Sequence, residues 1–151
     1  MDIPRFEYGH GADWPFWDDG DCYIIHGDAI AVLRTMPDSI AALVYADPPF
    51  NAGKEFRNKK KGNIGFSDIW KWDDEAEARL AELGAIADIE TGHDPPNVQM
   101  LFDYIPMVRD SMRDPALASY LSWCTLLLLE CRRVMGSTEY IKQPFVEVNY
   151  T

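Results

Sequence analysis

Two apolar runs separated by a short helical segment place the strongest constraint on how this chain can fold. Residues 22–26 read Cys-Tyr-Ile-Ile-His, and residues 40–46 form a second run without polar alternation. Such runs are typical of strands buried on both faces, as in a parallel sheet. Between them, Asp28 is placed to cap a helix over residues 29–35, which Pro37 closes. The pattern predicts a right-handed strand–helix–strand unit and an α/β fold.

The next part of the chain is predicted to be loop and then helix. Residues 51–71 are rich in Gly, Asn and Lys and are expected to form a long loop. Loops of this length are usually functional or disordered. An exposed acidic helix follows, in which Asp74 and Glu77 have capping-box spacing. A further segment, residues 97–112, is interrupted by Pro106.

The clearest predicted helix begins after the capping residue Asp114, with Pro115 in the first helical position, and ends at Gly136. A sheet strand should follow it. Residues 145–148 favour only a weak strand, because a proline and scattered polar residues surround them. The helix carries one apolar stripe: Leu117, Leu121, Cys124, Leu128 and Cys131.

Composition indicates a globular chain and argues against most nucleic-acid binders. Hydrophobic residues make up 47% of the 151 residues, which is too apolar for a disordered chain. The net charge is −11, whereas DNA-binding domains are usually basic. One basic cluster weakens this objection, because it can contact phosphate; a solvated loop explains it equally well. The cluster consists of Lys54, Arg57, Lys59, Lys60 and Lys61.

Other site classes have little support. The three cysteines show no spacing typical of zinc ligands or of a disulfide framework, so no metal is expected. Cys124 and Cys131 suit core packing. The N-terminus lacks the apolar core of a signal peptide, and no run of apolar residues is long enough to span a membrane. Cytoplasm is the default expectation.

The residues with the clearest chemical meaning follow the second apolar run: Asp47, Pro48, Pro49, Phe50 and Asn51. Ligands of open α/β sheets bind at the carboxyl ends of strands. An amine on a nucleic-acid base is a weak nucleophile, because its lone pair is delocalised into the ring. Hydrogen bonds from its N–H groups to the Asp47 carboxylate and the Pro48 carbonyl would free that lone pair to attack a methyl group.

The remaining residues of this motif suit the same chemistry. The two prolines stiffen the segment and fix both acceptors. Phe50 offers a face on which a base taken out of the duplex can stack. A second triplet, Asp94-Pro95-Pro96, has no apolar strand before it and Asn97 after it. We interpret that triplet as a turn or helix start.

With these residues the sequence resembles bacterial DNA N6-adenine/N4-cytosine methyltransferases, and more closely their beta subgroup, in which the catalytic motif precedes the cofactor-binding motif. The resemblance covers about residues 22–135. It is carried by His26-Gly27-Asp28 through Asn51, by residues 66–77 with Trp70 and Trp72, and by residues 118–135. Packing is the simpler interpretation of the two tryptophans.

The resemblance implies a partial Rossmann-like, S-adenosylmethionine-dependent methyltransferase fold, with an incomplete parallel sheet and flanking helices. It divides the chain into an irregular arm (1–21), the N-terminal portion of the catalytic domain (22–135) and a divergent tail (136–151). It implies catalytic Asp47, Pro48, Pro49 and Phe50. Asp28 and Asp47 would lie at S-adenosyl-L-methionine, although helix capping explains Asp28 equally well. Asn51 and the basic cluster would contact DNA.

Parts of the family pattern are missing. Residues 1–151 contain no Phe-x-Gly-x-Gly-type cofactor loop and no target-recognition region, and residues 134–137 depart from the family's next strand. The chain is therefore expected to be truncated, with an uncovered sheet edge. Catalysis would then require a second chain that supplies the missing half.

Several functions stay open at this stage. Phe50 after Asp-Pro-Pro favours methyl transfer to adenine N6 over cytosine N4, for which the first motif residue is usually Ser. RNA or protein substrates occur with related motifs, but the basic loop favours DNA. The non-enzymatic alternative is an inactive truncated remnant or an acidic interaction domain, which the net charge of −11 supports.

Overall fold

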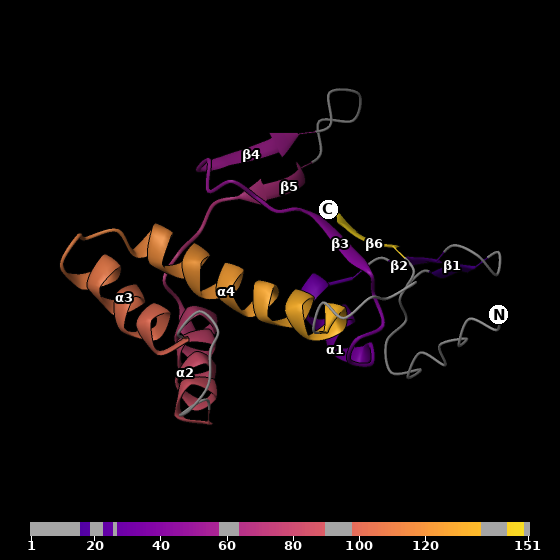
Figure 1. Cartoon of the computed structure of the whole chain (residues 1–151). Coiled ribbons are helices and arrows are strands. Elements are labelled where there is room, and N and C mark those ends of the chain that lie inside the picture. The colour runs from indigo at the N-terminus through magenta and orange to yellow at the C-terminus, as the bar shows by residue number, and fades with distance from the viewer. Residues whose placement is uncertain are drawn as a thin grey trace. The chain divides into compact units, whose positions relative to one another are not determined.

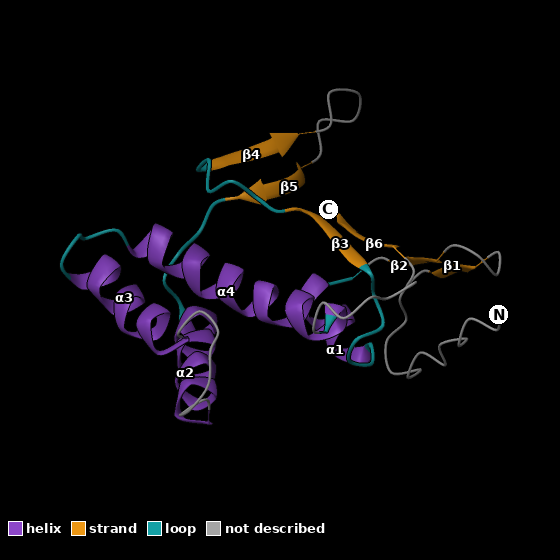
Figure 2. Ribbon diagram, viewed as in Figure 1, coloured by secondary structure: helices purple, strands orange, loops and turns teal. Residues whose placement is uncertain are grey.

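The computed structural model of the chain describes residues 16–18, 23–25, 27–57, 64–89, 98–136 and 145–149. Figure 1 shows the order of the elements, and Figure 2 separates helices from strands. The chain divides into two compact units, Met1–Asp47 with Leu129–Asn149 and Pro48–Leu128 with Tyr150–Thr151. The elements are β1 (Phe16–Asp18), β2 (Tyr23–Ile25), α1 (Ala29–Thr35), β3 (Leu43–Asp47), β4 (Lys54–Arg57), β5 (Ile64–Asp68), α2 (Asp74–Ile89), α3 (Val98–Asp110), α4 (Pro115–Met135) and β6 (Phe145–Asn149).

Helix α1 of the first unit forms over the predicted residues. The Asp28 carboxylate accepts a hydrogen bond from the Ala31 amide at 2.8 Å, which confirms the predicted cap. At the other end, the Arg133 guanidinium of α4 donates to the carbonyls of Leu33 at 2.6 Å and Met36 at 2.8 Å. The guanidinium thereby adds a donor at the end of the helix, where the Leu33 carbonyl also accepts from the Met36 amide at 2.9 Å.

The predicted strand–helix–strand unit does not form, because its two strands lie in different sheets. β2 pairs antiparallel with β1, which lies in the arm expected to be irregular. β3 pairs in parallel with β6, so the weak strand of the tail does form (Figure 1). Pairing with an apolar partner outweighs the low strand propensity of the tail, since strand preference depends strongly on context.

Strand β3 is also not buried on both faces, contrary to our expectation. Its exposure alternates along the strand, and Tyr45 is 57% exposed while its neighbours Val44 and Ala46 are partly buried. Successive side chains of a strand point to opposite faces of the sheet. One face of β3 is therefore packed and the other is open, although both are apolar in sequence.

The second unit contains a β-hairpin where a long loop was predicted. β4 and β5 pair antiparallel, with Lys54 opposite Asp68 and an irregularity between Phe56 and Arg57. The sequence did not indicate these strands, because the glycines and lysines of this segment are typical of loops. Residues 58–63, which include Lys59, Lys60 and Lys61, lie outside the described residues.

The cap of α2 is Asp73 and not Asp74. The Asp73 carboxylate accepts a hydrogen bond from the Ala76 amide at 3.0 Å. The predicted Asp74–Glu77 capping box is therefore wrong, and Glu77 accepts from the Trp72 indole N–H at 2.6 Å. Two adjacent aspartates are equally suitable caps, so the choice between them depends on how the chain enters the helix.

Helix α2 packs against α3 (Figure 1), while on its acidic face Glu75 is exposed as expected and Glu82 is partly buried. Gly84 of α2 lies against the Phe102 ring, where an added Cβ would approach a ring carbon to 3.0 Å. α3 also continues through Pro106 without the expected interruption. The buried side chains of the two helices are Ala76, Leu80, Leu83, Ala87, Val98, Ile105 and Val108.

Helix α4 begins and ends as predicted. The Asp114 carboxylate accepts from the Leu117 amide at 2.9 Å, and Gly136 follows the last turn. The predicted apolar stripe is wrong, because Leu128 is exposed while Ser119 and Ser122 are buried. These two hydroxyls accept hydrogen bonds from the Arg79 guanidinium, both at 3.2 Å, so polar residues occupy the packed face.

The described residues thus form a mixed α/β structure with small sheets. In this part of the chain, no helix is long and apolar enough to cross a membrane. No group of three His, Cys, Asp or Glu side chains is placed there to hold a metal ion. Cys131 is buried and Cys124 is partly buried, both as free thiols, and burial raises the pKa of each. The second triplet, Asp94-Pro95-Pro96, lies outside the described residues.

The close approach of Gly136 to Ser39 generates a prediction. Gly136 has φ +67°, and an added Cβ would meet the Ser39 hydroxyl and Cβ at distances no real side chain adopts. Gly136→Ala should lower the free energy of unfolding by more than the roughly 1–2 kcal/mol that a left-handed residue costs. Urea titration would measure this loss. In a Ser39→Gly background the same change should cost less; an equal loss in both backgrounds would contradict the predicted clash.

Candidate functional site

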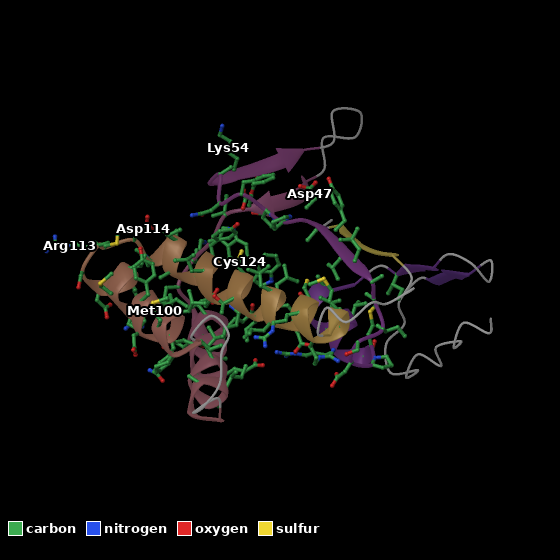
Figure 3. All side chains as sticks on the ribbon, in the orientation of Figure 1. Asp47, Lys54, Met100, Arg113, Asp114 and Cys124 are labelled. Carbon is green, nitrogen blue, oxygen red and sulfur yellow. The ribbon has the colours of Figure 1, made fainter. Side chains whose placement is uncertain are left out.

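The motif Asp47-Pro48-Pro49-Phe50-Asn51 begins at the carboxyl end of a strand, as predicted. Asp47 is the last residue of β3 and is exposed (Figure 3). This end of a parallel strand is where α/β proteins bind ligands. Asp28 is the other residue expected at the cofactor. Its carboxylate and its carbonyl accept hydrogen bonds from amides of α1. Capping thus accounts for Asp28 without a ligand.

The segment that follows the prolines is held by one buried carboxylate. Asp68, at the end of β5, is only 1% exposed. Its oxygens accept hydrogen bonds from the amides of Asn51 at 3.1 Å and Ala52 at 2.6 Å. The Gly53 amide donates to the Asp68 carbonyl at 3.1 Å. Three consecutive amides, those of residues 51–53, are therefore bound to this one residue.

The Trp70 indole completes the environment of this carboxylate, donating to Asp68 Oδ1 at 2.8 Å. Burial by itself raises the pKa of Asp68, because it disfavours the charged form. The backbone donors of Ala52, Asn51 and Phe50 and the Trp70 donor outweigh burial and hold the pKa below its ordinary value. Asp68 is accordingly an ionised anchor at neutral pH.

A tyrosine of α4 holds the second proline. The Tyr120 hydroxyl donates to the Pro49 carbonyl at 2.8 Å. The Tyr120 ring packs edge-on against Trp70 at 5.2 Å between centroids, and Trp70 also contacts Trp123 at 5.2 Å. Burial, followed by a hydrogen bond with Cys124, raises the pKa of Tyr120, so its hydroxyl remains a donor. The expectation that Trp70 packs is confirmed.

These contacts leave two groups of the motif available. Within the described residues, no hydrogen bond reaches the Pro48 carbonyl, whereas the Pro49 carbonyl is occupied. The Phe50 side chain is 76% exposed. Asn51 adopts φ 53°, a left-handed conformation that asparagine tolerates better than most residues. The turn therefore presents an aromatic ring to solvent from a fixed backbone.

The structure describes only part of the predicted phosphate-binding cluster. Lys54 is exposed at the start of β4, and its side chain extends away from the hairpin (Figure 3). Asn51 is partly buried. Arg57 ends β4, but its side chain is not described. The remaining lysines lie outside the described residues, so the cluster as a DNA contact stays a prediction.

Two residues of this arrangement were missed from the sequence, Asp68 and Tyr120. Asp68 is the one charged residue in the segment Phe66-Ser67-Asp68-Ile69-Trp70, which contains three large apolar or aromatic residues. An isolated carboxyl in such a segment is a usable signal, because burying it requires several hydrogen-bond donors. Tyr120 gave no comparable signal, since aromatic residues are common on packed helices.

Comparison with known proteins gives two local similarities. The chain is 44% identical over 50 residues to the DNA adenine methyltransferase YhdJ of Escherichia coli (strain K12), which is 33% of this chain and 15% of that protein. It is 38% identical over 58 residues to the type II methyltransferase M.ScaI of Streptomyces caespitosus, which is 38% of this chain and 18% of that protein. No family model and no solved structure matches the chain. Part of the chain is thus similar to DNA methyltransferases, and the matches span less than a fifth of these relatives.

Tyr120→Phe tests the hydrogen bond to Pro49. The variant keeps the ring packing and removes the donor, so it should lower the free energy of unfolding by about 0.5–1.5 kcal/mol. Urea titration followed by circular dichroism would measure the change. The control is Tyr104→Phe on α3, where the side chain is 42% exposed; its effect should be within about 0.5 kcal/mol. Equal losses for the two variants would contradict a contribution from the Pro49 hydrogen bond.

The lowered pKa of Asp68 gives an acid-stability prediction. Its contribution to stability is complete above the unfolded-state pKa, ordinarily 3.8, and is lost as pH falls through the lower folded-state value. The difference in unfolding free energy between wild type and Asp68→Asn should be constant from about pH 5 to 7 and shrink at lower pH. Urea titrations at a series of pH values would measure it. A difference that grows on acidification would contradict the assignment.

Proposed function

We propose that the chain carries the amine-binding segment of a DNA methyltransferase that uses S-adenosyl-L-methionine and acts on adenine N6. One observation carries this proposal: in a motif that begins at the end of a parallel strand, the Phe50 side chain is exposed and the Pro48 carbonyl accepts no hydrogen bond from the described residues. The two local matches support a DNA methyltransferase in general, and one of the two relatives is named as a DNA adenine methyltransferase.

The proposed roles follow from which groups are accessible. The exposed Asp47 carboxylate accepts one N–H of the target amine, and the Pro48 carbonyl accepts the other. Both bonds draw the nitrogen lone pair out of the ring, and their acceptors need no reorganisation during the reaction. The Phe50 ring stacks on the extruded adenine. Asn51, in the turn after the prolines, and the exposed Lys54, at the start of β4, would contact the flanking DNA backbone.

The residues present fit one end of the proposed cofactor. Asp47 is accessible, and Asp28 uses one carboxylate oxygen, Oδ1, to cap α1. A hydrogen bond from the cofactor to either residue requires only an acceptor, which a carboxylate supplies. When bound, S-adenosyl-L-methionine supplies an activated methyl group at its sulfonium. We propose a Rossmann-like sheet around β3 as the setting of this site, which the parallel pairing of β3 and β6 supports.

Two alternatives are separated by the reaction product. Cytosine N4 presents a similar amine, and Phe50 after the prolines is what favours adenine. A non-enzymatic acidic interaction domain is favoured by the net charge of −11. Such a domain would transfer no methyl group.

The experiment measures transfer of a labelled methyl group from S-adenosyl-L-methionine to duplex DNA, with the modified nucleoside identified by mass spectrometry. In the presence of a second chain that supplies the missing half, wild type should produce N6-methyladenine. Asp47→Ala should lower the rate by about 10²–10³-fold, as expected for the loss of a preorganised acceptor at the reacting group. Asp94→Ala is the matched control, because it alters the other Asp-Pro-Pro triplet, and it should leave the rate unchanged.

Each other outcome contradicts a stated part of the proposal. N4-methylcytosine as the product would replace adenine by cytosine as the target. If Asp47→Ala and Asp94→Ala lower the rate of methyl transfer equally, Asp47 has no specific role at the reacting amine. No transfer by wild type even with the second chain present would favour the interaction domain.

A further inference from the structure

We propose that Asp68 is a positioning residue, which fixes the backbone after the prolines so that Phe50 is presented as a rigid stacking surface. This inference rests on the proposed function, because it concerns the base that Phe50 would stack on. It assigns a role to a residue that touches neither the base nor the methyl donor. The observations that carry it are the convergence of three consecutive amides on Asp68 and the exposure of the adjacent Phe50.

The geometry leaves the turn little freedom. The Asn51 and Ala52 amides bind different oxygens of the Asp68 carboxylate, at 3.1 and 2.6 Å, so the carboxylate spans both peptide groups. The Gly53 amide binds the Asp68 carbonyl at 3.1 Å. Every backbone N–H from 51 to 53 is therefore bound to one residue.

This anchor explains why the Phe50 ring stays in solvent. An exposed phenyl group gains free energy if it can move against other apolar atoms. The aromatic group of Trp70, Tyr120 and Trp123 belongs to the same unit as Phe50. The anchored backbone holds Phe50 with its side chain 76% exposed. A ring held in this way loses little conformational freedom when a base stacks on it.

Aspartate is the residue that this environment requires. A carboxylate offers only acceptors, whereas an asparagine side chain has one acceptor oxygen and an NH2 group that donates. In Asp68→Asn, the NH2 group would face backbone N–H groups or the Trp70 indole N–H, so at least one donor near residue 68 would lose its acceptor. The turn should then open more often, although the shape of the side chain is unchanged.

The first test uses amide hydrogen exchange on the full chain. In wild type, the Asn51 and Ala52 amides should be protected, although Ala52 lies on the surface. Asp68→Asn should speed their exchange at least about tenfold, which corresponds to losing one such hydrogen bond. Asp73→Asn is the matched control, because asparagine caps a helix as well as aspartate does; it should leave these amides unchanged. Unprotected Asn51 and Ala52 amides in wild type would overturn the inference without any variant.

The second test measures stacking, with a single-stranded oligonucleotide that contains 2-aminopurine as the probe. Stacking on Phe50 should quench 2-aminopurine fluorescence, and Phe50→Ala should abolish the effect. Asp68→Asn should raise the concentration needed for half-maximal quenching by about tenfold, because an unanchored ring must be ordered on binding. Asp73→Asn should not change it.

The outcomes separate this inference from the proposed function. If Phe50→Ala leaves quenching unchanged, the stacking role fails, and with it part of the proposed function. If Phe50→Ala abolishes quenching while Asp68→Asn leaves the half-maximal concentration unchanged, the stacking role stands and the positioning role of Asp68 is wrong. If Asp68→Asn and Asp73→Asn weaken quenching equally, the effect is general destabilisation, which also overturns the inference.

Discussion

A buried carboxylate needs hydrogen-bond donors, and this requirement organises the second unit. The Asp68 side chain loses nearly all contact with water, a cost that several hydrogen bonds must offset. Its donors come from the turn after the prolines and from the Trp70 indole. The β4–β5 hairpin brings the turn and the carboxylate together, since Lys54 lies opposite Asp68 in its register. The motif is thus shaped by a residue far along the chain.

The parts of the fold that sequence patterns predicted are those that local contacts decide. Asp28 and Asp114 cap their helices as expected, because the acceptor and the amide are three residues apart. Predictions failed where a distant partner decides the outcome. β3 pairs with β6 of the tail and not with β2. The packed face of α4 contains serines because Arg79 of α2 reaches them.

The candidate site divides in the same way. Its accessible groups, the Asp47 carboxylate and the Phe50 ring, could be predicted because their chemistry is visible in adjacent residues. The residues that hold these groups in place could not be predicted. Tyr120 reaches the Pro49 carbonyl across 71 residues, and Asp68 reaches Asn51 across 17. Sequence patterns show which groups could react, whereas the groups that orient them appear only once the chain is folded.

The Asp68 anchor also bears on chemical ageing of the chain. Asparagine side chains deamidate when the backbone nitrogen of the next residue attacks the side-chain carbonyl carbon and closes a succinimide ring. At Asn51 that nitrogen belongs to Ala52, whose N–H donates to Asp68 at 2.6 Å. The peptide group cannot rotate into the attacking orientation without breaking this hydrogen bond. We therefore expect Asn51 to keep its amide during prolonged storage for as long as the turn stays folded.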